Sequence, residues 1–382
     1  MYMYDLSSQF SPVMEIRPSP SSVRRIICSM LFLLVVILRS TNLVLSHQGL
    51  VPSPQFPAIF TFGDSVLEAG NNNHLVTLAK ANFPPNGIDF PEGATGRFCN
   101  GKTILDIICE RIGLPHSPPF LDPGTTGTKI LRGVNYASGG GGILKETGAN
   151  FISRLSMSQQ ITFFRNTSHT ISQLLGKRYA SILLSRSLFS VGMGNNDYLN
   201  NYLLLGSPTR KQFTPEEFKN HLLSTLSSQL REVYDLGARK FMVFSVAPLG
   251  CIPSQLALRS SDGSCLDDVN YLTLDFNAGL QNMLTKLNDE LPDAKFKYVD
   301  VYGPLMQLVS NPSLHGFSTG KVACCGNGRF NGQIPCLISP LGNLCSDRTD
   351  FVFWDPFHTS EVANIILANQ FYDQFMAGLN LD

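Results

Sequence analysis

The stretch AIFTFGDSVLEAGNNN, residues 58–73, opens with a short apolar run and then turns polar. The run 58–62 carries no charge and is rich in β-branched and aromatic side chains, which is typical of a buried strand. Gly63 ends the run, and Ser65 follows at the exit of the strand. Sites in open parallel sheets form just beyond the carboxyl ends of strands, so Ser65 is a candidate nucleophile. The same serine is also a candidate helix N-cap, with Glu68 completing a capping box.

Apolar runs alternate with amphipathic helical patterns along the rest of the chain. Five strand-like runs lie at 58–62, 133–137, 187–192, 240–246 and 295–301. Helical patterns lie at 103–113, 218–238, 272–291 and 360–379. This alternation predicts an α/β fold with three layers, in which a central, mainly parallel five-stranded sheet is covered by helices on both faces.

The N-terminal 46 residues have the features of a targeting segment. Arg24 and Arg25 precede an apolar run of 13 residues, 26–38. This run is short for a membrane span and has the length of a signal-peptide core. The small side chains of Val44 and Ser46 predict cleavage after Ser46. An uncleaved signal anchor and an internal start methionine remain open alternatives.

The composition of the remaining chain restricts its partners. The 29 Lys and Arg residues balance 29 Asp and Glu residues, so no basic excess indicates nucleic-acid binding. No other apolar run reaches spanning length, and no stable membrane span is expected after cleavage of the signal. Because residues 47–382 contain no repeat and no low-complexity linker, we expect them to form a single domain.

The cysteines favour an oxidising compartment. Removal of the segment that contains Cys28 leaves eight of the nine cysteines, an even number that favours disulfides in a secreted chain. Cys251 and Cys265 flank a polar loop and are expected to pair. Cys99 and Cys109 either form a bridge or remain buried thiols. Two further bridges, in one of three possible pairings, are expected among Cys324, Cys325, Cys336 and Cys345.

Two further patterns concern metals and glycans. No C-x-x-C pair occurs, so we expect no zinc site or other metal site. The sequence NTS at Asn166 is the glycosylation acceptor of the mature chain.

Polar side chains suited to hydrolysis follow the predicted strands. Ser65 follows the first strand, a glycine run beginning at Gly139 follows the second, and Asn196 follows the third. Near the C-terminus, Asp355 lies three residues before His358, just ahead of the last predicted helix.

This combination of residue types can carry out acyl transfer. Serine is a poor nucleophile at its ordinary pKa and needs a base within hydrogen-bonding reach. Histidine titrates near neutral pH and can be that base, and a carboxylate can fix its tautomer. Backbone N–H groups of a glycine loop and an asparagine amide can stabilise the developing oxyanion.

Five motifs together resemble the GDSL esterase/lipase family of the SGNH hydrolase superfamily, most closely its secreted plant branch. They are FGDSVLEAGNNN (62–73), GVNYASGGGGIL (133–144), SVGMGNNDYL (190–199), FSVAPLGCIP (244–253) and FVFWDPFHTSE (351–361). The resemblance covers residues 57–379. It implies a secreted carboxylic ester hydrolase that acts on ester or lipid substrates through an acyl-serine intermediate and needs no cofactor. In a plant, the implied location is the cell wall or apoplast.

The resemblance also implies a role for each residue of the set. Ser65 is the expected nucleophile, His358 the base and Asp355 the acid that orients it. The expected oxyanion hole consists of the backbone N–H groups of Ser65 and Gly139 and the side chain of Asn196. A transacylase with a hydroxyl acceptor, and a secreted binding module without activity, are the alternative functions.

Three positions depart from the family pattern without removing a chemical group. Val66 replaces leucine, and Glu68 stands where the family usually has aspartate, which changes a contact near the nucleophile. Thr359 replaces a proline that would preset the first helical position, so a slightly looser histidine loop is expected.

The stretch GRFCNGKT, residues 96–103, fits the nucleotide-binding pattern G-x-x-x-x-G-K-[ST]. That pattern requires a buried strand directly before it, and the preceding residues NGIDFPEGAT do not form one. We therefore expect no nucleotide site, and we expect Thr103 to cap the helix that follows. Trp354, the one tryptophan, is expected to pack in the core.

Overall fold

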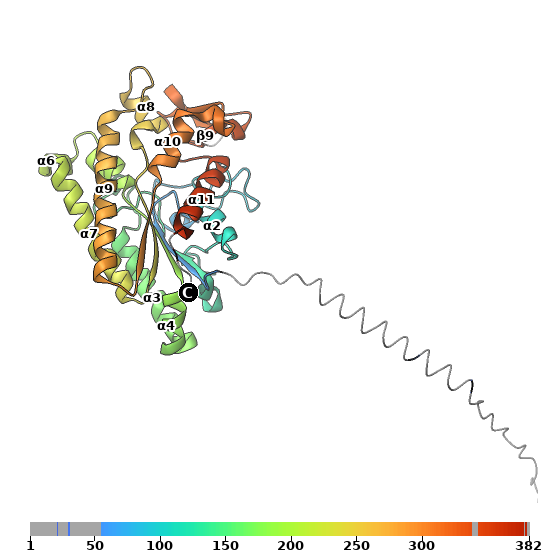
Figure 1. Cartoon of the computed structure of the whole chain (residues 1–382). Coiled ribbons are helices and arrows are strands. Elements are labelled where there is room, and N and C mark those ends of the chain that lie inside the picture. Colours follow the sequence, from blue (N-terminus) through green and yellow to red (C-terminus); the bar gives the residue numbers. More distant parts are fainter. Residues whose placement is uncertain (1–20, 22–29, 31–54, 338–342, 378, 380–382) are drawn as a thin grey trace, which may run out of the picture. The chain divides into compact units, whose positions relative to one another are not determined.

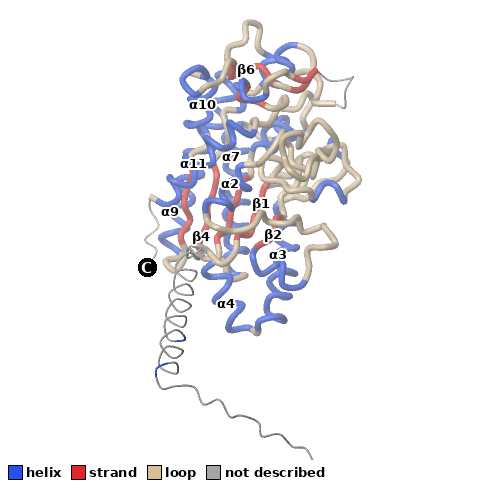
Figure 2. Tube along the Cα trace, turned by 90° about the vertical axis from the view of Figure 1, so that its right-hand side faces the viewer, coloured by secondary structure: helices blue, strands red, loops and turns tan. Residues whose placement is uncertain are grey.

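Five parallel strands form the central sheet in the structure, a computed structural model that describes residues 21, 30, 55–337, 343–377 and 379. The strands are β1 (Ile59–Gly63), β2 (Gly133–Asn135), β3 (Leu188–Gly192), β4 (Lys240–Phe244) and β5 (Lys295–Val299). Their order across the sheet is β2-β1-β3-β4-β5. The sheet lies between layers of helices in Figure 1, and β1, β2 and β4 are labelled in Figure 2. Every strand coincides with a predicted run, and the predicted three-layer α/β fold is confirmed.

Helices cover both faces of this sheet (Figure 1). One face carries α3 (Met157–Leu175), α4 (Lys177–Arg186), α7 (Pro215–Asp235) and α9 (Asp267–Glu290). The other carries α2 (Ile104–Arg111), α10 (Tyr302–Ser310) and α11 (Glu361–Met376). Shorter helices are α5 (Asn195–Asp197), α6 (Pro208–Gln212) and α8 (Pro253–Arg259). The four predicted helices correspond to α2, α7, α9 and α11, whereas α3, α4 and α10 were not predicted.

The strands alternate their side chains between two apolar cores. Phe60 and Phe62 of β1 enter the core beneath α3, α7 and α9, while Ile59 enters the core beneath α2 and α11. All residues of β1 are buried, as expected for a strand in the middle of a parallel sheet with both faces covered. This burial fixes the register of β1 and therefore the position of the turn that follows it.

A smaller region of short strands lies beside the sheet and precedes the last helix. β6 (Thr319–Ala323) pairs in parallel with β9 (Phe351–Phe353), and β7 (Cys325–Gly326) pairs in antiparallel with β8 (Asn343–Leu344). Trp354 is fully buried against the cysteines of this region and donates its indole N–H to Asn86 Oδ1 at 3.0 Å. Its predicted packing role is confirmed.

Three disulfides occur in the described part of the chain. Cys251 pairs with Cys265, as predicted. The four-cysteine segment adopts one of its three possible pairings, with the bridges Cys324–Cys345 and Cys325–Cys336. Cys99 and Cys109 are buried free thiols, which decides between the two alternatives for this pair.

The N-cap alternative for Ser65 is wrong, because residues 64–70 form turns and bends. The first helix after them is a short 3-10 turn, η1 (Asn71–His74), and Gly70 precedes it. Thr103 does cap α2: it accepts a hydrogen bond from the Asp106 N–H, and the Asp106 side chain accepts one from the Thr103 N–H.

The stretch 96–103 is a loop without a strand before it. Within this loop, Arg97 is buried and holds Asp106 with two hydrogen bonds of 2.7 and 2.8 Å. The lysine of the motif, Lys102, forms an ion pair with Glu110. The residues that fit the nucleotide-binding pattern therefore form a loop that supports the start of α2.

The remaining predictions on processing concern the chain ends and the surface. The predicted targeting segment, with its cleavage site after Ser46, lies outside the described residues except for positions 21 and 30. Asn166 is exposed on α3. Among the helices of the described residues, none is long and apolar enough to cross a bilayer.

Candidate active site

Ser65 lies on a tight turn directly after β1. Asp64 stabilises this turn, because its carboxylate accepts the Val66 N–H at 3.0 Å and its carbonyl accepts the Leu67 N–H at 3.3 Å. The Asn195 amide also donates to Asp64 at 3.1 Å, which links the turn after β1 to the turn after β3. Burial raises the pKa of Asp64, and the hydrogen bonds from Val66 and Asn195 oppose this rise.

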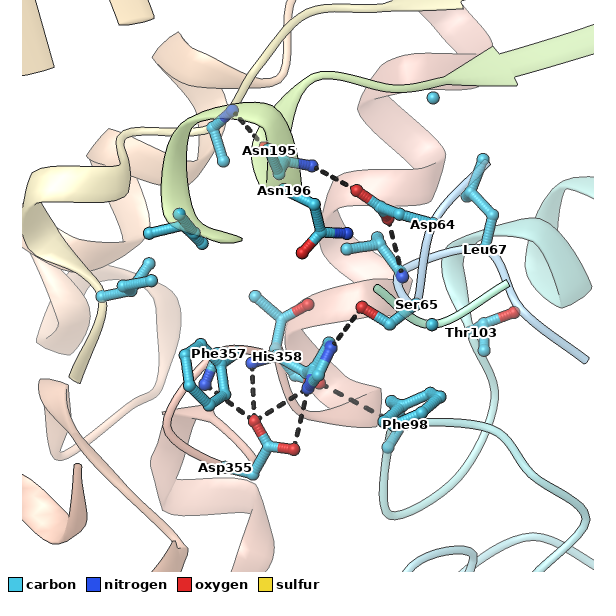
Figure 3. Close-up of a pocket in the computed structure, with 18 of the residues that line it drawn as sticks. Asp64, Ser65, Leu67, Phe98, Thr103, Asn195, Asn196, Asp355, Phe357 and His358 are labelled. Carbon is cyan, nitrogen blue, oxygen red and sulfur yellow. Dashed lines mark hydrogen bonds and ion pairs between the residues drawn. The ribbon is translucent and has the colours of Figure 1, made fainter. Parts of the chain in front are cut away.

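Ser65, His358 and Asp355 form a continuous hydrogen-bonded chain (Figure 3). His358 Nε2 lies 2.7 Å from Ser65 Oγ, although the two residues are 293 positions apart in the sequence. His358 Nδ1 lies 2.8 and 2.9 Å from the two oxygens of Asp355. The histidine and the aspartate are 9% and 7% exposed, so solvent has little access to the hydrogen bonds between them. This is the geometry that nucleophilic catalysis by serine requires.

Backbone contacts hold the loop that carries the histidine. Asp355 Oδ1 accepts the N–H groups of Phe357 and His358, both at 2.8 Å, so the carboxylate fixes the turn as well as the ring. The Trp354 N–H donates to the His358 carbonyl at 2.8 Å. Thr359, at the position where a looser loop was predicted, donates its hydroxyl to Asn364 Oδ1 at 2.5 Å.

The two asparagines after β3 have different surroundings. Both polar atoms of the Asn195 side chain are engaged, since its amide donates to Asp64 and its oxygen accepts the Ala247 N–H at 3.2 Å. Asn196 lines the cavity beside Ser65 and donates one amide hydrogen to the Gly141 carbonyl at 2.9 Å. An amide nitrogen has two hydrogens, so Asn196 retains one for a ligand.

The backbone N–H of Gly139 is engaged by a carboxylate. It donates to Glu68 Oε2, and the other oxygen of Glu68 accepts the Asn72 N–H at 2.5 Å. The next residue, Gly140, lines the cavity, and no hydrogen bond from its N–H is found within the described part of the chain. The same is true of the Ser65 N–H. The donor expected at Gly139 is thus already paired, and the neighbouring N–H of Gly140 is free for a ligand.

Two buried carboxyl groups hold the glycine run from either end. Glu68 is fully buried, and this burial raises its pKa to about 8 against the effect of its two backbone N–H donors. Asp197 is also fully buried, with a pKa raised to about 6, and it accepts the Ile143 N–H at 2.8 Å and the Thr147 hydroxyl at 2.6 Å. The sequence marked Glu68 as a capping-box partner of Ser65 and as a departure from the family pattern, and neither interpretation predicts its contact with Gly139. Its contact with a loop 71 residues away depends on the fold.

The cavity that contains Ser65 and His358 has a volume of about 220 Å³ and is mainly apolar. Its apolar lining includes Leu78, Phe151, Leu199, Leu249, Ile252, Leu305 and Phe357. Among the described residues, no cluster of His, Cys, Asp and Glu side chains is suited to hold a metal ion.

Comparison with known proteins agrees with this geometry. The profile of the GDSL-like lipase/acylhydrolase family matches residues 59–371. One GDSL esterase/lipase of Arabidopsis thaliana is 45% identical over 315 residues, which cover 82% of this chain and 81% of that protein. A second from the same plant is 47% identical, covering 82% of this chain and 86% of its own length. A third is 46% identical, covering 82% and 83%.

Proposed function

The chain belongs to the GDSL-like lipase/acylhydrolase family and is a carboxylic ester hydrolase, and we propose that it forms an acyl-enzyme intermediate on Ser65. The single observation that carries this proposal is the 2.7 Å contact between His358 Nε2 and Ser65 Oγ. A base at hydrogen-bonding distance is what turns an alcohol into an effective nucleophile.

In the first step, His358 takes the proton of Ser65 as Oγ attacks the carbonyl carbon of the ester. Asp355 fixes the tautomer, because its carboxylate accepts the Nδ1 hydrogen and leaves Nε2 free to accept the proton. The imidazolium then donates this proton to the leaving alkoxide, which departs as an alcohol. An ester bond to Ser65 forms as the ester bond of the substrate breaks.

The negative charge of the tetrahedral intermediate needs hydrogen-bond donors close to Ser65. We assign this role to the Ser65 N–H, the free amide hydrogen of Asn196 and the glycine run at Gly139 and Gly140. Within that run, the Gly140 N–H is the available donor, because the Gly139 N–H is held by Glu68. Donors fixed in place in this way stabilise a developing oxyanion without reorganisation.

The second step resolves the acyl-enzyme with water. His358 deprotonates a water molecule, which attacks the acyl carbon, and the proton then returns to Ser65 as the carboxylic acid leaves. The two steps use side chains and backbone groups of the chain together with one water molecule. The apolar lining of the cavity favours an ester with an aliphatic chain, such as a lipid ester.

A panel of p-nitrophenyl esters of increasing acyl length tests this proposal. Hydrolysis should be lost in Ser65→Ala for every member of the panel. Equal rates for Ser65→Ala and the unmodified protein would contradict it.

We also propose that the protein is secreted after removal of residues 1–46, leaving residues 47–382 as a single hydrolase domain. Three disulfides in the described part of the chain support an oxidising compartment. The exposure of Asn166 is compatible with a glycan at this position. N-terminal sequencing of secreted protein should begin at His47, and treatment with a glycosidase should lower its mass. An N-terminus upstream of Ser46 would contradict the cleavage site. An unchanged mass after glycosidase treatment would contradict the glycan at Asn166.

A further inference from the structure

An exposed apolar surface borders the mouth of the cavity. It consists of Val76, Leu78 and Ile152, whose exposed fractions are 80, 70 and 63%. We refer to these three residues as the rim patch. Exposed apolar side chains are unremarkable when they are isolated, but a group beside a ligand cavity marks an interaction site.

Hydrogen bonds join the two loops, far apart in sequence, that carry these side chains. The Leu78 N–H donates to the Phe151 carbonyl at 3.1 Å, and the Thr77 hydroxyl donates to the same carbonyl at 3.0 Å. Phe151 ends a short 3-10 turn, η3 (Ala149–Phe151), and Ile152 follows it directly. The rim patch therefore belongs to one joined pair of loops.

The rim patch is continuous with the catalytic cavity. Leu78 and Phe151 line that cavity together with Ser65. The Phe151 ring also packs on Gly140, where an added Cβ would lie 2.6 Å from the ring. An aliphatic chain that leaves an apolar phase at the rim patch would thus meet further apolar surface on its way to the nucleophile.

The rim patch carries no charge of its own. Neither segment 75–79 nor segment 147–153 contains an ionisable side chain. The cations that directly follow the two segments are engaged by backbone carbonyls: Lys80 donates to Asn72 and Leu75 at 2.6 and 2.8 Å, and Arg154 donates to Thr147 at 2.6 Å. Lys145, two residues before the second segment, is exposed, but the exposed Glu146 beside it leaves this pair without net charge. A neutral lipid surface fits this face better than an anionic membrane, which would require free cations.

The backbone at Ile152 adds an independent observation. Its φ of 74° lies in a region that a β-branched residue rarely adopts, and the side chain is mostly exposed. The isoleucine therefore contributes strain and little burial to the fold. A role in binding an apolar surface accounts for an aliphatic side chain at such a position.

We propose that the rim patch docks the enzyme on the surface of an aggregated neutral ester lipid, from which single chains enter the cavity. The proposal rests on the ester hydrolase function above and names the physical form of its substrate. Val76 and Ile152 insert into the lipid surface, and Leu78 connects that surface to the cavity. Attachment is apolar and independent of salt.

The test compares Val76→Ser/Ile152→Gly with the control Leu205→Ser/Leu314→Ser. Neither residue of the first pair lines the cavity, and glycine relieves the strain at position 152. The control removes two leucines that are 105 and 80% exposed and do not line the cavity. All proteins carry the same N-terminus, so its contribution to lipid binding is common to them.

Binding to trioctanoin droplets is measured in the Ser65→Ala background, as the lipid concentration that gives half-maximal binding. The rim variant, Val76→Ser/Ile152→Gly, should require at least about tenfold more lipid for half-maximal binding. The control variant should bind at the same lipid concentration as the protein without either pair of substitutions. In the active background, hydrolysis of soluble p-nitrophenyl acetate should change less than about twofold in the rim variant, while hydrolysis of emulsified trioctanoin falls about tenfold.

Equal droplet binding by the rim variant and the control would overturn the proposal. The proposal would also be overturned if the protein bound anionic phosphatidylglycerol vesicles more tightly than droplets and lost this binding at high salt. It would be overturned as well if the protein without rim substitutions self-associated and the rim variant did not. Failure of the ester hydrolase function can be distinguished from failure of the docking proposal. In that case the protein without rim substitutions would hydrolyse p-nitrophenyl acetate no faster than Ser65→Ala does, whatever the droplet binding shows.

Discussion

The carboxyl group of Glu68 accepts the backbone N–H of Gly139, which lies 71 residues further along the chain. Its second oxygen accepts the Asn72 N–H, so one fully buried side chain connects the segment after Ser65 to the glycine run. Gly140, the proposed oxyanion donor, follows directly. Glu68 therefore holds the segment that carries the proposed oxyanion donor.

Glu68→Gln should lower kcat by roughly 10–100-fold with little change in KM, because displacement of a catalytic group by about 1 Å is sufficient for such a loss. A glutamine has one acceptor oxygen in place of two, so one of the two backbone N–H groups loses its partner. Steady-state kinetics on a soluble ester measure the effect, with the exposed Glu92→Gln as the control. A Glu68→Gln enzyme with unchanged kcat would remove Glu68 from the site.

The raised pKa of Glu68 also predicts a pH dependence of stability. The folded protein holds this proton up to about pH 8, whereas the unfolded chain releases it near 4.5. The folded state thus binds more protons between these values, and its stability falls as pH rises through them. The melting temperature of the unmodified protein should therefore decline relative to Glu68→Gln between pH 5 and 8.

Thermal unfolding at three pH values measures this difference directly. Asp197, whose pKa is also raised by burial, titrates in both proteins and cancels in the comparison. A difference in melting temperature that stays constant, or that shifts in favour of the unmodified protein as pH rises, would contradict the assignment.

Asn196→Ala should lower kcat about 10²–10³-fold at nearly constant KM, because one donor to the oxyanion is lost. Asn195→Ala should instead lower the melting temperature, since both polar atoms of Asn195 hold neighbouring loops. Kinetics and thermal unfolding of the two variants separate these effects. If Asn195→Ala alone lost kcat while it kept its melting temperature, the donor would be Asn195.

His358→Ala should lose about 10⁴-fold or more in kcat, because among the described residues His358 is the side chain that hydrogen-bonds Ser65 Oγ. Asp355→Asn should remain folded and lose on the order of 10⁴-fold, since an amide favours the wrong tautomer of the imidazole. Circular dichroism verifies that each variant is folded, and steady-state kinetics give its kcat. Retention of more than a tenth of the activity by His358→Ala would exclude it as the base.

Removal of the Cys251–Cys265 bridge should destabilise the fold by about 2–4 kcal/mol, as expected for a bridge that closes a loop of 14 residues. Denaturant unfolding of Cys251→Ser/Cys265→Ser measures this loss. Cys109→Ala is the matched control, because Cys109 is a free thiol. Equal unfolding midpoints for the double variant and the unmodified protein would contradict a structural role of the bridge.

The sequence was sufficient for the sheet and for the three residues of the hydrogen-bonded chain, because each follows a local pattern. The strand 58–62 is fully apolar, and Asp355 and His358 lie within one turn. The pairing within the four-cysteine segment 324–345 was not predictable, since it depends on the antiparallel contact of Cys325 with Leu344. Helix α3 was missed although Ser156 and Gln159 form a capping box, a signal that the sequence contains.

The contact of Glu68 with Gly139 was beyond local reasoning for a different reason. A glutamate three positions after Ser65 has the spacing of a capping box, and this local interpretation is wrong. The carboxylate instead accepts an N–H from a loop that reaches it only once β2 pairs with β1. Sequence patterns thus identified which side chains meet at the candidate site, and tertiary structure was needed to find what holds them in place.

The most direct test of the central claim is the site of covalent labelling by a fluorophosphonate, determined by mass spectrometry of the peptides. We predict one label per chain, on Ser65, and no label in Ser65→Ala or in folded protein whose His358 has been replaced by alanine. A label on any other serine, together with full ester hydrolysis by Ser65→Ala, would contradict the account.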